Sequence, residues 1–93
     1  MSAVVCEIEL LIPGSGSLKA KRHVIKSIMG RIKARCNASV AETGFQDSWQ
    51  RAVISVAMVS SDHVLLQKQI ELIRQIIYDN ADAELVDISS EYI

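Results

Sequence analysis

The hydrophobic residues of this chain switch repeatedly between a two-residue and a helical period, and this order limits the possible folds. Residues 4–12 alternate hydrophobic with mixed positions, which predicts a strand with one buried face. Apolar residues at helical spacing then predict a helix that begins after Ser17. Two strands, residues 38–43 and 50–60, precede a second helix and a last strand over 84–92. The predicted order is βαββαβ.

This order favours a ferredoxin-like fold of the α+β class. A helix that connects two strands of one sheet lies on a sheet face and makes a right-handed crossover. The economical arrangement is a four-stranded antiparallel sheet in the order 4-1-3-2 with both helices on one face. The length fits a single domain over residues 1–93.

Strand alternation assigns each side chain to one face of this predicted sheet. The side chains expected to point toward the helices are Val4, Cys6, Ile8, Ala52, Ile54, Val56, Met58, Val86 and Ile88. Those expected on the open face are Val5, Glu7, Glu9, Leu11, Val53, Ser55, Ala57, Leu85 and Asp87. The open face is then flat, aliphatic and locally acidic.

An open face of this kind favours self-association over RNA binding. RNA-recognition sheets stack bases on aromatic residues of their central strands, and no aromatic residue lies on these two strands. We therefore expect a homodimer or larger oligomer. Its expected interface residues are Val5, Leu11, Val53 and Leu85.

The net charge of −1 conceals a strongly uneven distribution of charge. Seven of the ten Lys and Arg residues lie in the first predicted helix, and no acidic residue lies between Glu9 and Glu42. These candidate anion- or RNA-binding residues are Lys19, Lys21, Arg22, Lys26, Arg31, Lys33 and Arg35. The chain after Arg74, by contrast, contains acidic residues and no further cation.

Cations at the amino end of a helix oppose its dipole, at a cost of about 0.3–1 kcal/mol each when exposed. A phosphate bound between these cations and the Gly14–Gly16 loop would offset that cost. The alternative is that the cations only solvate the outer face of the helix. In that case Arg22, beside the apolar stripe, snorkels or pairs with a carboxylate.

The connection between the two middle strands contains the only Phe and the only Trp of the chain. Its candidate recognition or core-closing residues are Gln46, Asp47, Trp49, Gln50 and Arg51. Aromatic and Arg side chains dominate interface hot spots, so this loop is a candidate recognition element. The alternative, which we favour, is that Trp49 closes one end of the core.

The chain has no sequence pattern typical of a metal, redox or cofactor site. Cys6 and Cys36 are isolated, without the spacing of a zinc site or of a disulfide framework. The carboxylates Glu7, Glu9 and Asp87 are expected to be solvated or paired with Arg51 rather than to hold a metal. No cofactor, metal or small-molecule substrate is expected.

Neither histidine has a partner at a spacing typical of catalysis. We expect His23 and His63, each at a helix start, to be surface residues. The segment Met1–Pro13 has no basic start or cleavage site of a secretory signal. No apolar run approaches the ~20 residues that a membrane span requires. A cytosolic location without membrane association is therefore expected.

Motifs along essentially the whole chain resemble the bacterial YlxP-like family, a small family of unknown function. They are Ser17-Leu18-Lys19 with Lys21-Arg22, Val40-Ala41-Glu42, Gln46-Asp47, Trp49-Gln50-Arg51-Ala52 and Val59-Ser60-Ser61-Asp62. The resemblance implies a ferredoxin-like fold and genes often found among those for translation initiation and ribosome maturation. It implies no catalytic residues.

The sequence and the resemblance together lead us to expect a non-catalytic protein that binds RNA or the ribosome through the basic helix. The alternative is a homo-oligomeric interaction or ligand-sensing module without a nucleic-acid role. A phosphate-handling enzyme is a weaker alternative, since some enzymes of this fold use a Gly loop and an Arg at this first helical turn.

Overall fold

The predicted βαββαβ order is present in the structure, a computed structural model that describes all 93 residues. The elements are β1 (Ser2–Leu11), α1 (Leu18–Arg35), β2 (Ala38–Gly44), β3 (Arg51–Ser60), α2 (His63–Tyr78) and β4 (Glu84–Tyr92). Both helices begin at side-chain caps: the Ser17 hydroxyl accepts from the Ala20 N–H, and the Asp62 carboxylate accepts from the Val64 N–H.

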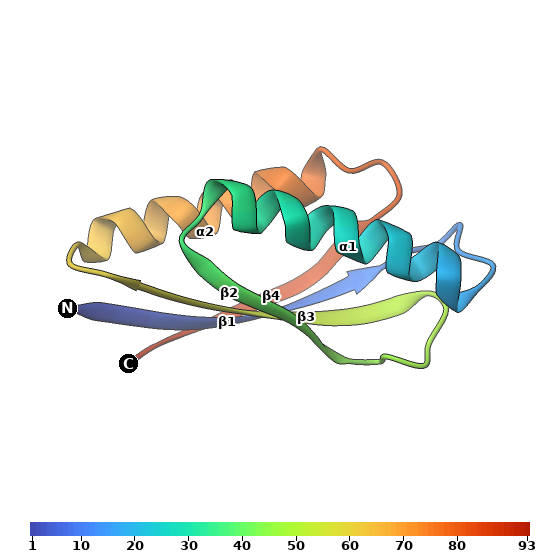
Figure 1. Cartoon of the computed structure of the whole chain (residues 1–93), viewed down its shortest axis with the longest axis horizontal. Coiled ribbons are helices and arrows are strands. Elements are labelled where there is room, and N and C mark those ends of the chain that lie inside the picture. Colours follow the sequence, from blue (N-terminus) through green and yellow to red (C-terminus); the bar gives the residue numbers. More distant parts are fainter.

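The four antiparallel strands form one sheet in the order β2-β3-β1-β4, which is the predicted order read from the other edge. Both helices cover the same face of this sheet, as Figure 1 shows. The molecule is elongated, with principal extents of 42 × 22 × 19 Å. The two termini lie at one end of it, and the β2–β3 loop lies at the other end beside the start of α1 (Figure 1).

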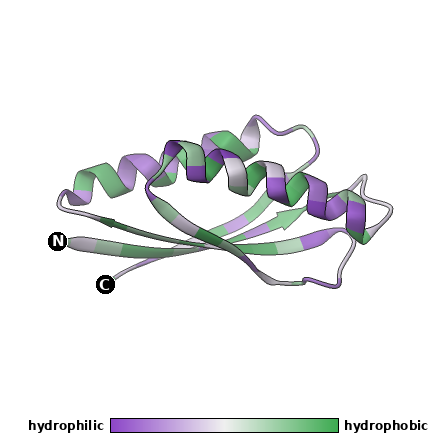
Figure 2. Cartoon of the chain, viewed as in Figure 1, coloured by the Kyte–Doolittle hydropathy of each residue, from purple (hydrophilic) through white to green (hydrophobic).

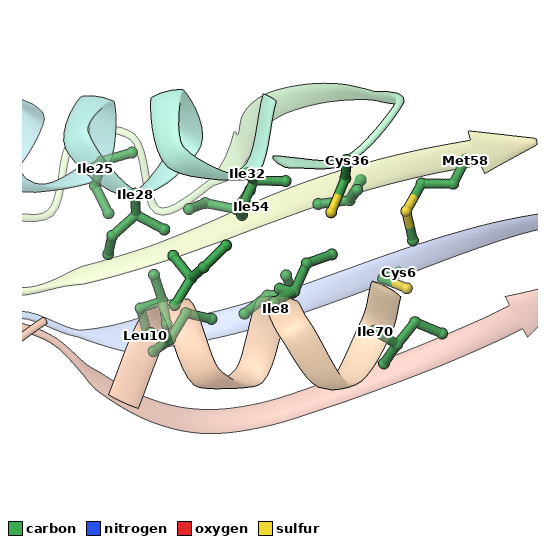
Figure 3. Packing of buried hydrophobic residues seen from close by; sticks show 14 of the residues in the cluster. Cys6, Ile8, Leu10, Ile25, Ile28, Ile32, Cys36, Ile54, Met58 and Ile70 are labelled. Carbon is green, nitrogen blue, oxygen red and sulfur yellow. The ribbon is translucent and has the colours of Figure 1, made fainter. Parts of the chain in front are cut away.

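The core between the sheet and the helices contains 18 buried hydrophobic residues, and none of them is aromatic. Figure 3 shows how Ile25, Ile28 and Ile32 of α1 point toward Ile54 of β3 and Ile8 of β1. Every predicted inward residue of β1 and β3 is buried, so the strand alternation is confirmed there. Neither helix has the length and apolar character that crossing a membrane would require.

In the last strand the predicted alternation is confirmed at Ile88, which packs against the core, but it is wrong at Leu85 and Val86, because a bulge shifts the register. Asp87 pairs with Glu9, but the next pair along β1 is Leu10 with Leu85, which leaves Val86 as the extra residue. Leu85 therefore packs against the core, while Val86 is 48% exposed. Leu85 is not an open-face interface residue.

Candidate functional site

Six of the seven cations of α1 are exposed at the surface. They are Lys19, Arg22, Lys26, Arg31, Lys33 and Arg35. None of the six forms a salt bridge: the three salt bridges of the protein involve Lys21, Arg51 and Arg74. The charges of these six residues are therefore not paired within the protein.

Helical spacing brings several of these cations onto one outward row. Lys19, Arg22, Lys26 and Lys33 follow one another at intervals of three, four and seven residues, which places them on one side of a helix. The first three, with His23, surround a shallow hollow of about 470 Å³. Figure 2 shows hydrophilic residues along the first half of α1. We call Lys19, Arg22, His23, Lys26 and Lys33 the outward row.

Lys21 does not belong to this surface, so its prediction as a ligand-binding residue is wrong. Its side chain is 0% exposed and lies under the first turns of α1. The ammonium donates to the carbonyl oxygens of Phe45, Gln46 and Arg51, at 2.8, 3.3 and 3.1 Å. These three acceptors match the three N–H donors of a lysine.

The Glu42 carboxylate compensates the buried charge of Lys21. One carboxylate oxygen lies 3.0 Å from the ammonium nitrogen, and the Glu42 side chain is 15% exposed. That oxygen has no hydrogen-bond partner, whereas the ammonium donates to the three carbonyls. The contact is thus chiefly one of charge. We call Lys21, Glu42 and the three carbonyls the Lys21 latch.

The residue spacing in α1 contains a signal for this burial that the sequence analysis missed. Lys21 lies three residues after Leu18, four before Ile25 and seven before Ile28, so it continues the apolar stripe. Arg22 fits the spacing to Leu18 and Ile25 but not to Ile28, and it is exposed. The stripe-side cation that pairs with a carboxylate is therefore Lys21.

The strand alternation in β2 contains the matching signal. Glu42 follows Ala38 and Val40 at two-residue intervals, and it pairs with the buried Ile54 of β3. A glutamate at a core-facing strand position requires a cationic partner. The stripe lysine and this glutamate could have been paired from the two periodicities together.

The Gly14–Gly16 loop lines a hollow of about 530 Å³ together with Lys19, His23 and Asp82. Its own groups already use part of its hydrogen-bonding capacity: the Ser15 N–H donates to the Ile12 carbonyl, and the Ser15 hydroxyl donates to the Ser17 carbonyl. Neither glycine has a positive φ. The loop therefore has ordinary backbone geometry.

The β2–β3 loop exposes its aromatic side chains, so the prediction that Trp49 closes the core is wrong. Trp49 is 55% exposed and Phe45 is 43% exposed. The Arg51 guanidinium lies over the Phe45 ring, 4.0 Å from its centroid, and also binds the Glu9 carboxylate at 3.1 Å. An aliphatic core leaves these rings at the surface.

Two other loop residues hold the loop in place rather than project from it. The Gln46 side chain donates to the Glu42 carbonyl at 2.8 Å, and the Gln50 side chain donates to the Ser15 carbonyl at 3.3 Å. Asp47 is exposed and forms no salt bridge. The loop is thus tied to the segment before α1 as well as to Lys21.

The open sheet face has the predicted mixture of small, aliphatic and acidic side chains. Val5, Leu11 and Val53 are half-buried on it. The expected pairing of Glu9 with Arg51 is confirmed. No group of three or more His, Cys, Asp or Glu side chains lies close enough to hold a metal ion.

The two cysteines and His63 do not belong to the outward row. Both cysteines are free and buried. Burial raises the pKa of the Cys36 thiol, and the neighbouring Arg35 lowers it by a smaller amount. His63 packs against Tyr92 with ring centroids 4.4 Å apart.

Comparisons with known proteins agree with the resemblance that the motifs indicate. Residues 3–90 match the family described as a protein of unknown function, DUF503. The chain is 43% identical over 65 residues, 70% of its length, to the "Uncharacterized protein YlxP" of Bacillus subtilis (strain 168), of which 71% is covered.

Two solved structures share the fold at low sequence identity. One is the de novo designed protein Foldit4, with a TM-score of 0.57, 18% identity and coverage of 98% of this chain and 96% of that one. The other is LarC2, the C-terminal domain of a cyclometallase, with a TM-score of 0.51, 16% identity and coverage of 100% and 56%. From the family match and the curated relative together, the chain belongs to the DUF503 family of YlxP-like proteins.

Proposed function

We propose that this chain is a non-catalytic, cytoplasmic factor that binds RNA or the ribosome through the outward row of α1. The observation that supports this most is the set of six exposed cations without any ion pair. Phosphate groups are the partners that an uncompensated row of Lys and Arg attracts most strongly. Contacts of this kind bind the nucleic-acid backbone rather than its sequence.

The shape of the protein supports binding on this face. The residues of the outward row are exposed, whereas the buried side of α1 consists of Lys21, Ile25, Ile28 and Ile32. The helix, which lies on one face of the sheet (Figure 1), therefore presents the charges of the row to solvent. The acidic residues Glu7, Glu9 and Asp87 belong to the opposite, open face of the sheet. An RNA approaching α1 therefore meets positive charge without the repulsion of the acidic face.

Titration of a labelled RNA oligonucleotide at several salt concentrations tests this proposal. We expect affinity to fall steeply with salt, with a slope of about 0.7 per phosphate contact for a single strand. The double variant Lys26→Gln/Lys33→Gln should weaken binding and reduce the slope by about one contact per lost charge. Lys68→Gln, which removes an exposed lysine from α2, is the matched control.

Co-sedimentation of the protein with ribosomes at low and high salt extends the test to the cellular particle. The Lys26→Gln/Lys33→Gln variant should be lost from the ribosome fraction, and the Lys68→Gln control should remain in it. The proposal would be refuted if the RNA affinity of the Lys26→Gln/Lys33→Gln variant depended on salt in the same way as that of the Lys68→Gln control. It would also be refuted if the parent protein bound neither RNA nor ribosomes at any salt concentration.

A second candidate is self-association through the open sheet face, on which Val5, Leu11 and Val53 are not covered by any other element. Light scattering at micromolar concentration should then give at least a dimer. Val53→Arg should dissociate it, because the change places an unpaired charge in the contact. A monomeric parent protein would exclude this candidate.

A further inference from the structure

The β2–β3 loop gathers two exposed rings into a short segment at one end of the molecule. Phe45 and Trp49 are four residues apart, and both expose more than two fifths of their surface. The Arg51 guanidinium stacks on one of them, 4.0 Å from the ring centroid. Exposed aromatic and arginine side chains that lie together are typical of binding surfaces.

The loop holds a defined conformation although its rings face solvent. The Ser48 N–H donates to the Phe45 carbonyl at 2.9 Å, and the Arg51 N–H donates to the Ser48 hydroxyl at 3.2 Å. Below the loop, the buried ammonium of Lys21 binds three of its carbonyls. A ligand would therefore meet rings on a loop that is already ordered, which reduces the entropy lost on binding.

The backbone of Phe45 is itself unusual. Its φ of 55° lies in the left-handed region, and Phe45 is the only residue other than glycine with a positive φ. Bulky side chains are uncommon in this region and stay there only when the surrounding contacts impose it. The Phe45 carbonyl accepts the shortest of the three bonds from Lys21, 2.8 Å, which is such a contact.

The latch also joins this loop to the start of the basic helix. Lys21 lies between Lys19 and Arg22, whose side chains are exposed, and Gln50 binds the Ser15 carbonyl just before α1. The exposed rings are thus fixed at the same end of the molecule as the first cations of α1 (Figure 1). Proteins that bind single-stranded nucleic acid combine these two features: cations follow the phosphates, and bases stack on the rings.

On this geometry, and resting on the function proposed above, we infer that the Phe45–Arg51 loop binds unpaired RNA bases by stacking, chiefly on Trp49. The first turns of α1 hold the adjoining phosphates. The protein then prefers single-stranded over duplex RNA, because the bases of a duplex are stacked on one another and have no free face for Trp49. Lys21 acts as a positioning residue and does not touch the RNA.

Trp49 is the only tryptophan, so its fluorescence reports directly on this site. Titration with an unlabelled single-stranded oligouridine should quench it to saturation, and a duplex RNA of equal length should not. Trp49→Ala should lose about 10-fold in affinity for the single strand, since stacking on one ring has roughly this value. Its salt slope should equal that of the parent, because no phosphate contact is removed.

Two control variants separate a stacking role from general effects. Trp49→Phe keeps a ring and should restore most of the affinity. Tyr78→Ala removes a ring that is 71% exposed on α2 and should bind like the parent protein. The thermal melt of Trp49→Ala should match that of the parent, because the side chain is largely outside the core.

The outcomes distinguish this inference from the proposed function. Salt-dependent RNA binding with an unchanged affinity of Trp49→Ala, or with equal affinity for duplex and single strand, would refute the stacking inference and leave the function of the outward row intact. Loss of ribosome association by Trp49→Ala without loss of RNA affinity would mean that the loop docks a protein, which also refutes it. Binding of neither RNA nor the ribosome by the parent protein would refute both.

Discussion

The inward and outward sides of α1 use the same residue types for opposite purposes. On the inward side, Lys21 gives all its hydrogen bonds to the protein, and its charge is compensated by Glu42. On the outward side, Lys19 and Arg22 have no ion-pair partner. A buried lysine is tolerated only when it is fully paired, whereas a surface lysine requires no partner. The charge of a residue therefore does not reveal its role until its face is known.

The largest expected difference between the two sides concerns Lys21. Lys21→Met should lower the free energy of unfolding by about 3–5 kcal/mol, because it leaves the largely buried Glu42 charge unpaired. It also leaves three loop carbonyls without their donor. Urea denaturation measures this change. Lys21→Met/Glu42→Gln should recover part of the loss, and a single variant as stable as the parent would contradict the latch.

A substitution at Gly30, unlike Lys21→Met, should raise the free energy of unfolding. Gly30 lies within α1 on the outward side, and no atom lies within 4 Å of the position that a Cβ would occupy. Gly30→Ala should raise the free energy of unfolding by about 1 kcal/mol, since alanine has the higher helix propensity. The same urea denaturation detects this gain. A loss of stability would mean that the outward side of α1 has packing constraints of its own.

Arg22→Gln should change stability by only a few tenths of a kcal/mol, and toward greater stability. The residue is exposed and unpaired, and removing its charge relieves an unfavourable interaction with the helix dipole. Thermal melts at low ionic strength are suited to an effect of this size. A clear decrease in Tm would show that Arg22, like its neighbour Lys21, has a structural role.

The smallest expected effect is on the pH dependence of stability, and it concerns Cys36, the buried residue that follows the last turn of α1. Burial raises the pKa of Cys36, so folding favours the protonated thiol. The stability that the protonated Cys36 thiol contributes is complete below the ordinary thiol pKa of about 8.5. It is lost as the pH rises through the higher pKa that this thiol has in the folded protein. Cys36→Ala should therefore show a shallower decline in stability above that pH than the parent. Equal declines would show that the thiol does not contribute.

Periodicity predicted the elements, the strand order and the buried face of β1 and β3, because a large aliphatic core follows hydrophobic spacing. It failed at Leu85, since a single-residue bulge reverses the alternation and has no hydrophobic signature. The prediction that Trp49 closes one end of the core, which did not come from periodicity, was also wrong. The aliphatic side chains fill that core without an aromatic ring.

The candidate site was predictable only in part. The charge distribution identified all seven cations of α1 as candidates, but it did not separate the buried Lys21 from the six at the surface. The latch was not identified, because its recognition needs the helical period around Lys21 and the strand period around Glu42 to be considered together. No local pattern predicts that three carbonyls of a distant loop will accept from one side chain.

The acceptors in the Lys21 latch are main-chain carbonyls, and this affects which substitutions the β2–β3 loop can tolerate. Lys21 binds main-chain oxygens, which every amino acid provides, so its support of the loop does not depend on which side chains the loop carries at Asp47 and Trp49. Substitutions at positions 47 and 49 can then alter what the loop recognises while its shape persists. The same arrangement makes positions 47 and 49, whose side chains make no bond that holds the loop, a natural place to vary a binding surface on a scaffold of only 93 residues.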